Sequence, residues 1–558
     1  MATKITREII ESFLDCRYKG YLKLAGVYGS PSAYEQLMRE SRARIRLAAT
    51  TKLQAQHEEG QALQRLTLTL GVLKRGVQFL LEATVENEEF CLCFDALQRA
   101  TGSSRLGDFY YVPVLFHEAE RPVRKLNVQL ELLGQILGSI QGRQPDWGIL
   151  IYGRNCELKK VKLKPNGQQT KRVMEAIKEL WERKTPRLTL NSHCTVCEFR
   201  HRCHTEALAK DDLSLLRSVG EKDIERYERK GIFTVTQLSY TFRLRKKHKR
   251  HRQRQPHYPA LKALAIRDKK IYVLGTPDLP VCPVRIYFDI EGDPDRRFDY
   301  LLGLIVEANG AEERFSFWAD TPEEEQRVFQ QFLDVISRYP DCRLYAYGNY
   351  EAVFLRRMVK KLERPDLRET LLPRLVNILA VIHAHVYFPT YSNGLKAIAG
   401  CLGLRWTAAE ASGVQSIVWR RRWEETPSAL VKDVLTTYNL EDCAALQKVT
   451  QYLYALYSQQ PMTNGVVGHE GPKISRVEQT ALQSRMRGWN QAIFAVPDFG
   501  YLNARASFDY QRERVFLRTT QAGRKGQRRH RSRQGKKDTR ANRHIALATN
   551  ARRAEERR

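Results

Sequence analysis

The clearest hydrophobic pattern in the chain lies at residues 286–294, which read IYFDIEGDP. Isoleucine and phenylalanine alternate there with tyrosine and acidic residues, and a period of two residues predicts a half-buried β-strand. Asp289 and Glu291 are two positions apart, so their side chains share one face of this strand. Because neighbouring carboxylates repel each other, the pattern predicts a nearby cation that offsets their charge.

The pattern around this strand predicts a C-terminal α/β domain in residues 275–460, built on a mixed sheet. Three strands in succession, then a helix and a further strand, are typical of a meander followed by a crossover connection. Apolar positions at helical spacing dominate from there to the end of the domain. The predicted strands are residues 284–292, 299–308, 313–320 and 343–348, and the predicted helix before the last strand covers 322–338.

A second α/β domain is predicted in residues 1–208. Its apolar residues follow a helical period in some segments and form short β-branched and aromatic runs in others. The predicted helices cover about 5–24, 33–48, 126–140 and 168–183, and the predicted strands cover 75–86, 89–99, 108–118 and 147–153.

The sequence pattern of residues 209–260 predicts two short helices that connect the domains. Glycine turns at Gly220 and Gly231 separate their apolar runs. This arrangement resembles a helix-hairpin-helix, whose backbone amides can contact a phosphate. A plain helical linker is the alternative. Residues 461–558 are weakly patterned and basic, with a short strand or two predicted.

Much of the formal net charge of +30 is concentrated in two segments. Residues 243–254, RLRKKHKRHRQR, contain eight Lys and Arg and no acid, and residues 521–558 contain fourteen against three acids. Basic runs of this kind attract polyanions, most often nucleic acid, so we expect DNA, or else RNA, as the partner. A solvated linker and tail that bind nothing specific are the alternative.

The apolar stretches of the chain are short. The longest, such as LVNILAVIHAHVYF, fall short of a membrane span and contain histidine. The N-terminus lacks the apolar core of a signal peptide. We therefore expect no membrane association and a cytoplasmic location.

Two further stretches carry acidic residues that can join Asp289 and Glu291. Glu351, in AYGNYEAVFLRRM, follows a predicted strand and enters a helix. Tyr438 and Asp442, in TYNLEDCAALQKV, are four residues apart and share one face of a helix. If strand and helices converge, these side chains form an oxygen-rich pocket of the kind that Mg²⁺ or Mn²⁺ prefers. Structural acids that cap a turn or pair with arginine are the alternative.

The D-x-E strand, the mid-domain acid and the Y-x-x-x-D helix resemble the DEDDy exonucleases of the RNase H-like fold, most closely the YprB-type domain. The segments YFDIEGDPDRRFDYLLGL and VYFPTYSNGLKAIAGCLGLRW support the likeness, which covers most of the C-terminal domain. It implies that Asp289, Glu291 and Asp442 hold two Mg²⁺ or Mn²⁺ ions for phosphodiester hydrolysis. It also implies that Tyr438 orients the attacking water and that Glu351 stands where the group usually has aspartate.

A cluster of cysteines ends the first domain. Cys194, Cys197 and Cys203, in HCTVCEFRHRC, are spaced as C-x2-C-x5-C, which is typical of a metal centre. Zinc with a neighbouring histidine as the fourth ligand fits this spacing. Cys16, however, lies in FLDCRYK near the start of the domain, and one early cysteine followed by this triplet resembles the iron–sulfur staple of RecB/AddB-type nucleases. That likeness implies a 4Fe–4S cluster held by the four cysteines, with zinc as the alternative.

A RecB-like domain implies a restriction-endonuclease-like fold with a PD-(D/E)xK metal site. Asp95, near the end of a predicted strand, is the candidate for its first catalytic acid, and Gln129 resembles the helical glutamine of the family. The next strand should carry an acid, a spacer and lysine, but Leu115 and His117 stand at those positions. The missing E-x-K favours a first domain that binds nucleic acid without cutting it, and a cleavage site of shifted geometry is the alternative.

The order of a RecB-like domain, a helix-hairpin-helix-like segment and a YprB-type domain resembles the RecB-like nucleases of bacteria. We therefore expect a metal-dependent nuclease of DNA repair or maintenance, a 3′–5′ exonuclease acting through its C-terminal domain, with a helicase as a candidate partner. The leading alternative is a catalytically inactive nucleic-acid-binding scaffold, which the missing E-x-K and the neutral Asn377 favour. An RNA-processing enzyme that requires the 2′-OH is a further alternative.

Overall fold

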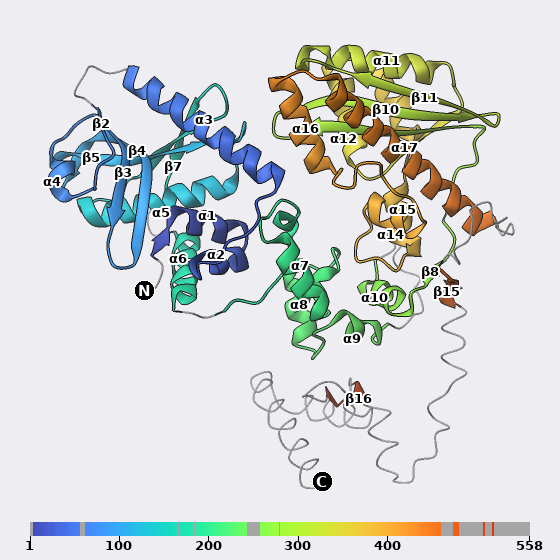
Figure 1. The fold of residues 1–558 in the computed structure, drawn as a ribbon, viewed down its shortest axis with the longest axis horizontal. Helices are drawn as coiled ribbons and strands as arrows, with labels where there is room; N and C mark the ends of the chain where they lie inside the picture. The colour runs from blue at the N-terminus through green and yellow to red at the C-terminus, as the bar shows by residue number, and fades with distance from the viewer. Residues whose placement is uncertain are drawn as a thin grey trace, which may run out of the picture.

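The structure, a computed structural model, contains two α/β domains, each built on a large sheet, and a helical region between them (Figure 1). It describes residues 4–55, 62–164, 167–182, 185–242, 257–277, 279–458, 472–478, 506–507 and 516–517. The basic segment 243–254 and most of residues 461–558 lie outside the described residues, so the predictions made for them remain predictions.

Seven strands form the N-terminal sheet among the described residues. They are β1 (Ile5–Thr6), β2 (Ala62–Gln64), β3 (Phe79–Glu86), β4 (Phe90–Ser104), β5 (Gly107–His117), β6 (Trp147–Tyr152) and β7 (Glu157–Lys162). Their order is β2-β3-β4-β5-β6-β7, with β1 paired to β4. Strands β3, β4 and β5 form an antiparallel meander, and β5 and β6 run parallel.

Helices cover this sheet. They are α1 (Arg7–Asp15), α2 (Arg17–Leu24), α3 (Ala33–Ala55), α4 (Leu70–Lys74), α5 (Arg124–Gln141) and α6 (Gln168–Trp181). The sequence predicts one helix over 5–24, and this prediction is wrong because the chain is extended at Cys16, with φ −161°. The two resulting helices pack closely, since a Cβ on Gly20 would lie 2.9 Å from the Cα of Phe13. The break places Cys16 at the corner between α1 and α2.

The helical region follows residue 190. It consists of η1 (Ser192–Thr195), α7 (Arg200–Ala209), η2 (Leu213–Leu215), α8 (Glu221–Glu228), α9 (Val235–Ser239) and α10 (Pro259–Asp268). The chain between α8 and α9 turns at Gly231, whose φ of +74° suits glycine. Leu215, Val219 and Leu238 share a buried cluster with Cys197 and Cys203, so the region packs around the cysteines.

Five strands form the C-terminal sheet among the described residues. They are β9 (Val284–Asp293), β10 (Phe298–Ala308), β11 (Ala311–Trp318), β12 (Cys342–Ala346) and β13 (Leu375–Asn377), in the order β11-β10-β9-β12-β13. The first three strands are antiparallel, whereas β9, β12 and β13 are parallel. The predicted meander, crossover and mixed sheet are therefore confirmed.

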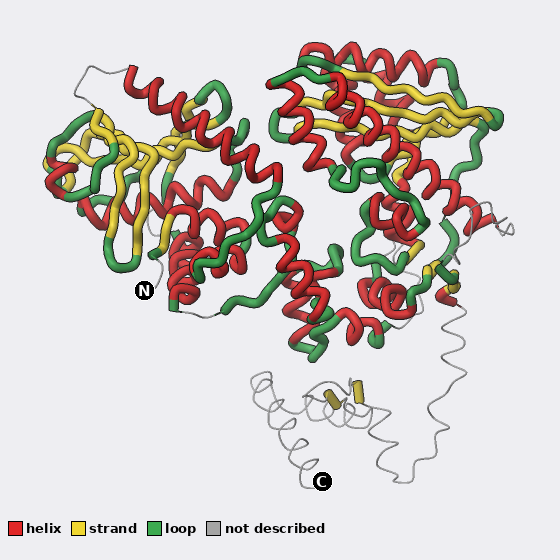
Figure 2. The backbone as a smooth tube through the Cα atoms, viewed as in Figure 1, coloured by secondary structure: helices red, strands yellow, loops and turns green. Residues whose placement is uncertain are grey.

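Helices flank both faces of this sheet (Figure 2). They are η3 (Pro322–Glu324), α11 (Glu325–Ser337), α12 (Tyr350–Lys361), α13 (Pro365–Leu371), η4 (Leu372–Arg374), α14 (Ile378–His385), α15 (Leu395–Cys401), α16 (Gly413–Glu425) and α17 (Ala429–Ser458). Phe288 of β9 packs on Phe332 of α11, with ring centroids 5.3 Å apart. Tyr287 instead belongs to the buried cluster that contains Leu446 of α17. Because strand side chains alternate, Asp289 and Glu291 lie on the α17 side of β9.

Short strands complete the fold. A small sheet joins β8 (Ile271–Val273) to β14 (Val386–Tyr387) and β15 (Ile474–Arg476), and β16 (Ala506–Ser507) pairs with β17 (Phe516–Leu517). The sequence did not predict β8, and its partner β15 lies about two hundred positions away. Within the described ranges, no helix combines the length and the apolar character that crossing a membrane requires.

Candidate active site

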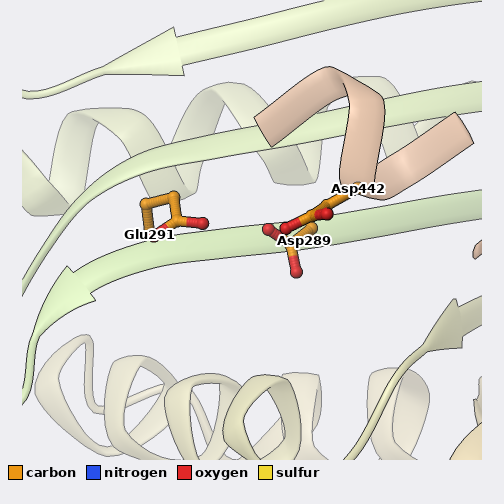
Figure 3. Close-up of side chains that lie close together, drawn as sticks. All are labelled: Asp289, Glu291 and Asp442. Carbon is orange, nitrogen blue, oxygen red and sulfur yellow. The ribbon is translucent and has the colours of Figure 1, made fainter. Parts of the chain in front are cut away.

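Asp289, Glu291 and Asp442 converge between β9 and α17 (Figure 3). One carboxylate oxygen from each residue lies within 4.8 Å of the other two. Glu291 and Asp442 are buried and Asp289 is half-buried. Among the described residues, this is the one group in which at least three His, Cys, Asp or Glu side chains approach one another so closely. Oxygen atoms arranged in this way suit a hard divalent cation.

Asp289 is positioned by a close approach of α17 to the sheet. The amide nitrogen of Asn439 on α17 donates a hydrogen bond to Asp289 Oδ2 at 2.8 Å. Gly303 lies opposite Asp289 on β10, and a Cβ at Gly303 would lie only 2.0 Å from Asn439 Oδ1. A glycine is therefore required where the helix crosses the strand. Asn439 was missed by the sequence reasoning, although it lies three residues before Asp442 on the same helical face.

Neutral donors hold the other two carboxylates. The hydroxyl of Ser416 on α16 donates to Glu291 Oε2 at 2.5 Å, and the indole N–H of Trp406 donates to Asp442 Oδ1 at 2.7 Å. Within the part of the chain that the structure describes, no Lys or Arg nitrogen lies within 4.0 Å of Asp289, Glu291 or Asp442. The cluster is oriented by hydrogen bonds but its negative charge is not offset by an ion pair.

The pKa values of the three acids reflect this imbalance. Burial, followed by the charges of Asp442, Glu291 and Glu351, raises the pKa of Asp289 well above its ordinary value. Burial raises the pKa of Glu291 to about 8 and that of Asp442 to about 6. A bound cation would favour the ionised forms and remove the penalty.

Glu351 lies beside this group but outside its tightest part. It is in the first turn of α12, is 4% exposed, and its charge contributes to the raised pKa values of Asp289 and Glu291. Burial raises the pKa of Glu351 itself to about 6. Its Oε2 atom is buried and has no hydrogen-bond partner among the described residues. An unpartnered buried acceptor facing other carboxylates fits a site that takes a cation or its hydrating water.

Tyr438 completes the set predicted from the sequence. It is 4% exposed and its hydroxyl hydrogen-bonds to Asp442. Burial and the charges of Glu291, Asp442 and Asp289 raise the pKa of Tyr438. The phenol therefore keeps its proton at neutral pH and can orient a water molecule, but it is a poor base.

Lys396 on α15 is a further residue that the sequence reasoning did not single out. Its ammonium lies 4.7 Å from the ring centroid of Tyr438 and 4.9 Å from that of Trp406. It also donates a hydrogen bond to the carbonyl of Ala411. Burial lowers the pKa of Lys396, while Asp442 and Glu291 act in the opposite direction. It brings a positive charge to the edge of the carboxylate group.

Asn377 has a structural role in this arrangement. Its side chain accepts a hydrogen bond from Ala380 N–H and so caps the N-terminus of α14. Its amide also donates to Asn349 Oδ1 at 3.2 Å. A capping role explains a neutral residue at this position, so Asn377 does not count against a charged site formed by the acids.

Asp95 lies in a different environment in the N-terminal domain. It is 1% exposed and forms ion pairs with Arg7 at 2.7 Å and Arg46 at 2.8 Å. Its second oxygen accepts a hydrogen bond from Phe116 N–H at 2.8 Å. Both carboxylate oxygens are therefore engaged by donors from the protein itself.

The surroundings of Asp95 extend this pattern. Glu11 pairs with Arg7 and Arg42, each at 2.8 Å, and accepts a hydrogen bond from Gln129 at 2.7 Å. Arg42 also pairs with Glu118 at 3.0 Å. We call this group, Arg7, Glu11, Arg42, Arg46, Asp95 and Glu118, the acid–arginine cluster. Leu115 is buried in the core, and the ring nitrogen of His117 accepts a hydrogen bond from Ala119 N–H.

The four cysteines line one small pocket. Cys16, Cys194, Cys197 and Cys203 surround a cavity of about 10 Å³ together with Lys19 and His193. Burial and the neighbouring thiols raise the pKa of Cys203 to about 12, and burial raises that of Cys197 to about 11. In the described chain no three of these sulfur atoms lie within 4.8 Å of one another. The residues predicted for the cysteine centre thus share a pocket without closing on a single point.

A model of the RNase H superfamily matches residues 286–454. The match begins in β9, ends in α17 and includes Asp289, Glu291, Glu351, Tyr438 and Asp442. No curated protein matches the chain. The C-terminal domain is therefore RNase H-like, which confirms the coarser part of the sequence prediction and indicates a nuclease-type hydrolase of nucleic acid. The YprB-type assignment, the RecB-like first domain and the helix-hairpin-helix remain predictions.

Proposed function

We propose that the protein is a metal-dependent nuclease that removes nucleotides from the 3′ end of a nucleic acid, with the C-terminal domain as its catalytic unit. The observation that carries this proposal is the convergence of three carboxylates that have hydrogen-bond donors but no cation of their own. Asp289, Glu291 and Asp442 would hold Mg²⁺ or Mn²⁺, and Glu351 would bind from the side. Such ions, when bound, lower the pKa of an attacking water and offset the charge of the reacting phosphate.

Other residues of the chain would orient the carboxylates, the attacking water and the phosphate. Asn439, Ser416 and Trp406 fix the three carboxylates, so that little reorganisation is needed when the substrate binds. Tyr438, which keeps its proton, orients the water that attacks phosphorus. Lys396, whose ammonium lies 4.7 Å from the ring centroid of Tyr438, would contact a non-bridging phosphate oxygen. These roles together support hydrolysis of a terminal phosphodiester bond.

Replacing Asp289 by asparagine tests the proposal. The variant keeps the size of the side chain but removes a charge that the ions require. We expect the degradation rate of a 5′-labelled oligonucleotide in Mg²⁺ or Mn²⁺ to fall by at least about 10²-fold, with binding of the oligonucleotide retained. The matched control is Asp341→Asn, an exposed acid in the same domain, which should cut at the wild-type rate. Circular dichroism would check that both variants fold.

Two outcomes would overturn the proposal. A wild-type protein that binds the oligonucleotide and cuts it with neither ion would be a nucleic-acid-binding scaffold, and an Asp289→Asn variant that cuts normally would move the active site elsewhere. Products that shorten stepwise from the 3′ end would support the exonuclease. DNA and RNA versions of one oligonucleotide would decide between DNA maintenance, with a helicase as candidate partner, and RNA processing.

We further propose that the four cysteines hold a 4Fe–4S cluster. Two thiolates bound to one zinc ion lie at most about 4.6 Å apart, because each Zn–S bond is about 2.3 Å long. Each thiolate of a 4Fe–4S cluster binds a different iron, so the sulfur ligands of the cluster lie farther apart than those of one zinc ion. Among the described residues no three of these four sulfur atoms lie within 4.8 Å of one another, which supports this choice.

Anaerobic purification tests the cysteine centre independently of nuclease activity. We expect a brown protein that contains iron and acid-labile sulfide, and Cys194→Ser should lose both. Cys91→Ser, a half-buried cysteine outside the pocket, is the matched control. A colourless protein that contains one zinc ion per chain would overturn the cluster.

A further inference from the structure

A second cavity, of about 330 Å³, lies between α7 and the loop that precedes α15. Arg200, His201 and His204 line it from α7, and Arg217 lines it from the segment after η2. The opposite side is formed by Tyr391 and Ser392 of the C-terminal domain. The two sides touch, since Arg217 N–H donates to the carbonyl of Tyr391 at 3.4 Å. The cavity therefore spans the junction between the helical region and the RNase H-like domain.

The lining of this cavity is basic. Two arginines and two histidines contribute to it, whereas no Asp or Glu does. Within the described residues, neither Arg200 nor Arg217 lies within ion-pair distance of a carboxylate. This contrasts with the nearby arginines Arg187 and Arg226, which pair with Asp212 and Asp223. Guanidinium groups without acidic partners beside hydroxyl groups are suited to bind phosphate.

The cavity is connected to the active site by a firmly held loop. Lys262 Nζ donates to Thr390 Oγ1 at 3.1 Å and to Asn393 Oδ1 at 2.6 Å. The hydroxyl of Tyr347 donates to the carbonyl of Asn393 at 2.6 Å. The loop leads directly into the first turn of α15, where Lys396 lies beside Tyr438. Lys396 follows Ser392 by four positions, so their Cα atoms are at most about 14 Å apart.

The cavity also borders the cysteine pocket. Cys194 and Arg200 line both spaces, and Cys203 lies on the same helix as Arg200. The cysteines therefore fix the helix that presents Arg200, His201 and His204 to the cavity. Disturbing the cysteine centre should disturb the basic surface next to it.

We propose that this cavity is a phosphate-binding subsite for the nucleic-acid strand that enters the active site. Arg200 and Arg217 bind backbone phosphates a few nucleotides from the scissile bond, which positions the strand without reading its sequence. The inference rests on the proposed nuclease function for its ligand, but binding can be measured without cleavage.

Charge removal at the cavity provides the test. Full-length Arg200→Gln/Arg217→Gln protein is titrated against a fluorescent single-stranded oligonucleotide of about twenty nucleotides in EDTA, between about 50 and 200 mM salt. We expect at least a tenfold rise in Kd at the lower salt concentration. We also expect the slope of log K against log salt to become shallower by about 1.4, since each single-strand phosphate contact contributes about 0.7.

The matched control removes two arginines from outside the cavity. Arg226 lies on α8 and Arg229 caps its C-terminus; both are mostly exposed and pair with acids of this helix. The variant Arg226→Gln/Arg229→Gln should bind like the wild type, with an unchanged salt slope. Equal losses in both double variants would show a general charge effect and overturn the subsite, as would unchanged binding in the cavity variant.

Two further variants keep the test decisive. Arg217 is exposed and lies outside α7, so Arg217→Gln alone cannot affect folding through the cysteine helix, and it should lower the slope by about 0.7. Asp289→Asn should abolish cleavage while keeping the wild-type slope. If the salt slope responds as expected but neither the wild type nor any variant cuts the oligonucleotide, the subsite stands and the nuclease proposal fails. If cleavage is lost only with Asp289 and the slope never changes, the subsite fails.

Discussion

The two sheets of the protein each carry buried or half-buried acids on a central strand, Asp95 on β4 and Asp289 and Glu291 on β9, but the surroundings of these acids differ. In the N-terminal domain, Arg7, Arg42 and Arg46 supply the positive charge within the acid–arginine cluster. In the C-terminal domain, the donors to Asp289, Glu291 and Asp442 are neutral.

This difference in surroundings shifts the pKa values of the acids in the two clusters in opposite directions. Burial acts to raise the pKa of Glu11, but Arg7 and Arg42 outweigh it and lower the pKa to about 2. In the C-terminal domain burial raises the pKa of Glu291 to about 8. Buried carboxylates need a cation in either case. The first cluster contains its cations, whereas the acids of the second form no ion pair with Lys or Arg among the described residues, an arrangement suited to bind a divalent cation.

The strongest test of this comparison removes a cation from the acid–arginine cluster. Arg7 is mostly buried and pairs with both Asp95 and Glu11. Arg7→Met should lower the free energy of unfolding of the N-terminal domain by about 3–5 kcal/mol, because Asp95 and Glu11 each lose one of their two arginine partners. Chemical denaturation followed by tryptophan fluorescence measures this. Lys4→Met, which breaks the exposed pair with Glu86, should cost less than about 1 kcal/mol. Equal costs would show that the arginines do not offset the buried charge.

Acid sensitivity should separate the clusters in the same way. Because the folded-state pKa of Glu11 is below its ordinary value of 4.5, Glu11 stabilises the fold above about pH 4.5, and this contribution is lost as pH falls through about 2. A lowering from 4.5 to about 2 corresponds to about 3 kcal/mol. Unfolding free energies at several pH values should therefore fall more steeply for the wild type than for Glu11→Gln. Parallel curves would contradict the role given to Arg7 and Arg42, and Glu86→Gln is the exposed control.

The acids of the C-terminal site could be predicted because each lies in a regular local pattern. Asp289 and Glu291 alternate on a strand, and Tyr438 and Asp442 are one helical turn apart. Their partners Ser416, Trp406 and Asn439 are ordinary polar and aromatic residues whose contacts depend on how α16 and α17 pack on the sheet. Nothing local in the sequence marks that packing, and even the glycine that permits it, Gly303, resembles any other strand glycine before the fold is known.

Asp95 shows what a local sequence pattern cannot reveal. Its position near a strand end made it a reasonable catalytic candidate, but its partner Arg46 is 49 positions away and Arg7 lies on the first helix. A local pattern identifies an acid and cannot reveal what neutralises it. The break at Cys16 was missed for a related reason. The helical period continues through it, and the extended backbone appears only where α1 and α2 pack together.

The smallest expected effect concerns the metal-free C-terminal site, where neutralising one acid should stabilise the protein. At pH 9, above the pKa of about 8 that burial gives Glu291, the ionised acids repel one another, and among the described residues none of them forms an ion pair with a Lys or Arg side chain. Asp289→Asn removes the carboxyl group whose ionisation is opposed by burial and by the charges of Asp442, Glu291 and Glu351, and its new amide oxygen can still accept the hydrogen bond from Asn439. In EDTA we expect the free energy of unfolding of the C-terminal domain to rise by about 1 kcal/mol, the scale of a single like-charge interaction in a protein. Scanning calorimetry of wild type and variant measures this, with Asp341→Asn as the exposed control.

Saturating Mn²⁺ should then reverse the order of stability, because at one hundred times its Kd a bound ion adds about 2.7 kcal/mol to the free energy of unfolding of the wild type alone. If Asp289→Asn is less stable in EDTA, as we expect for Asp95→Asn, then Asp289 is held by compensating contacts like those of Asp95, and the contrast between the two clusters does not hold.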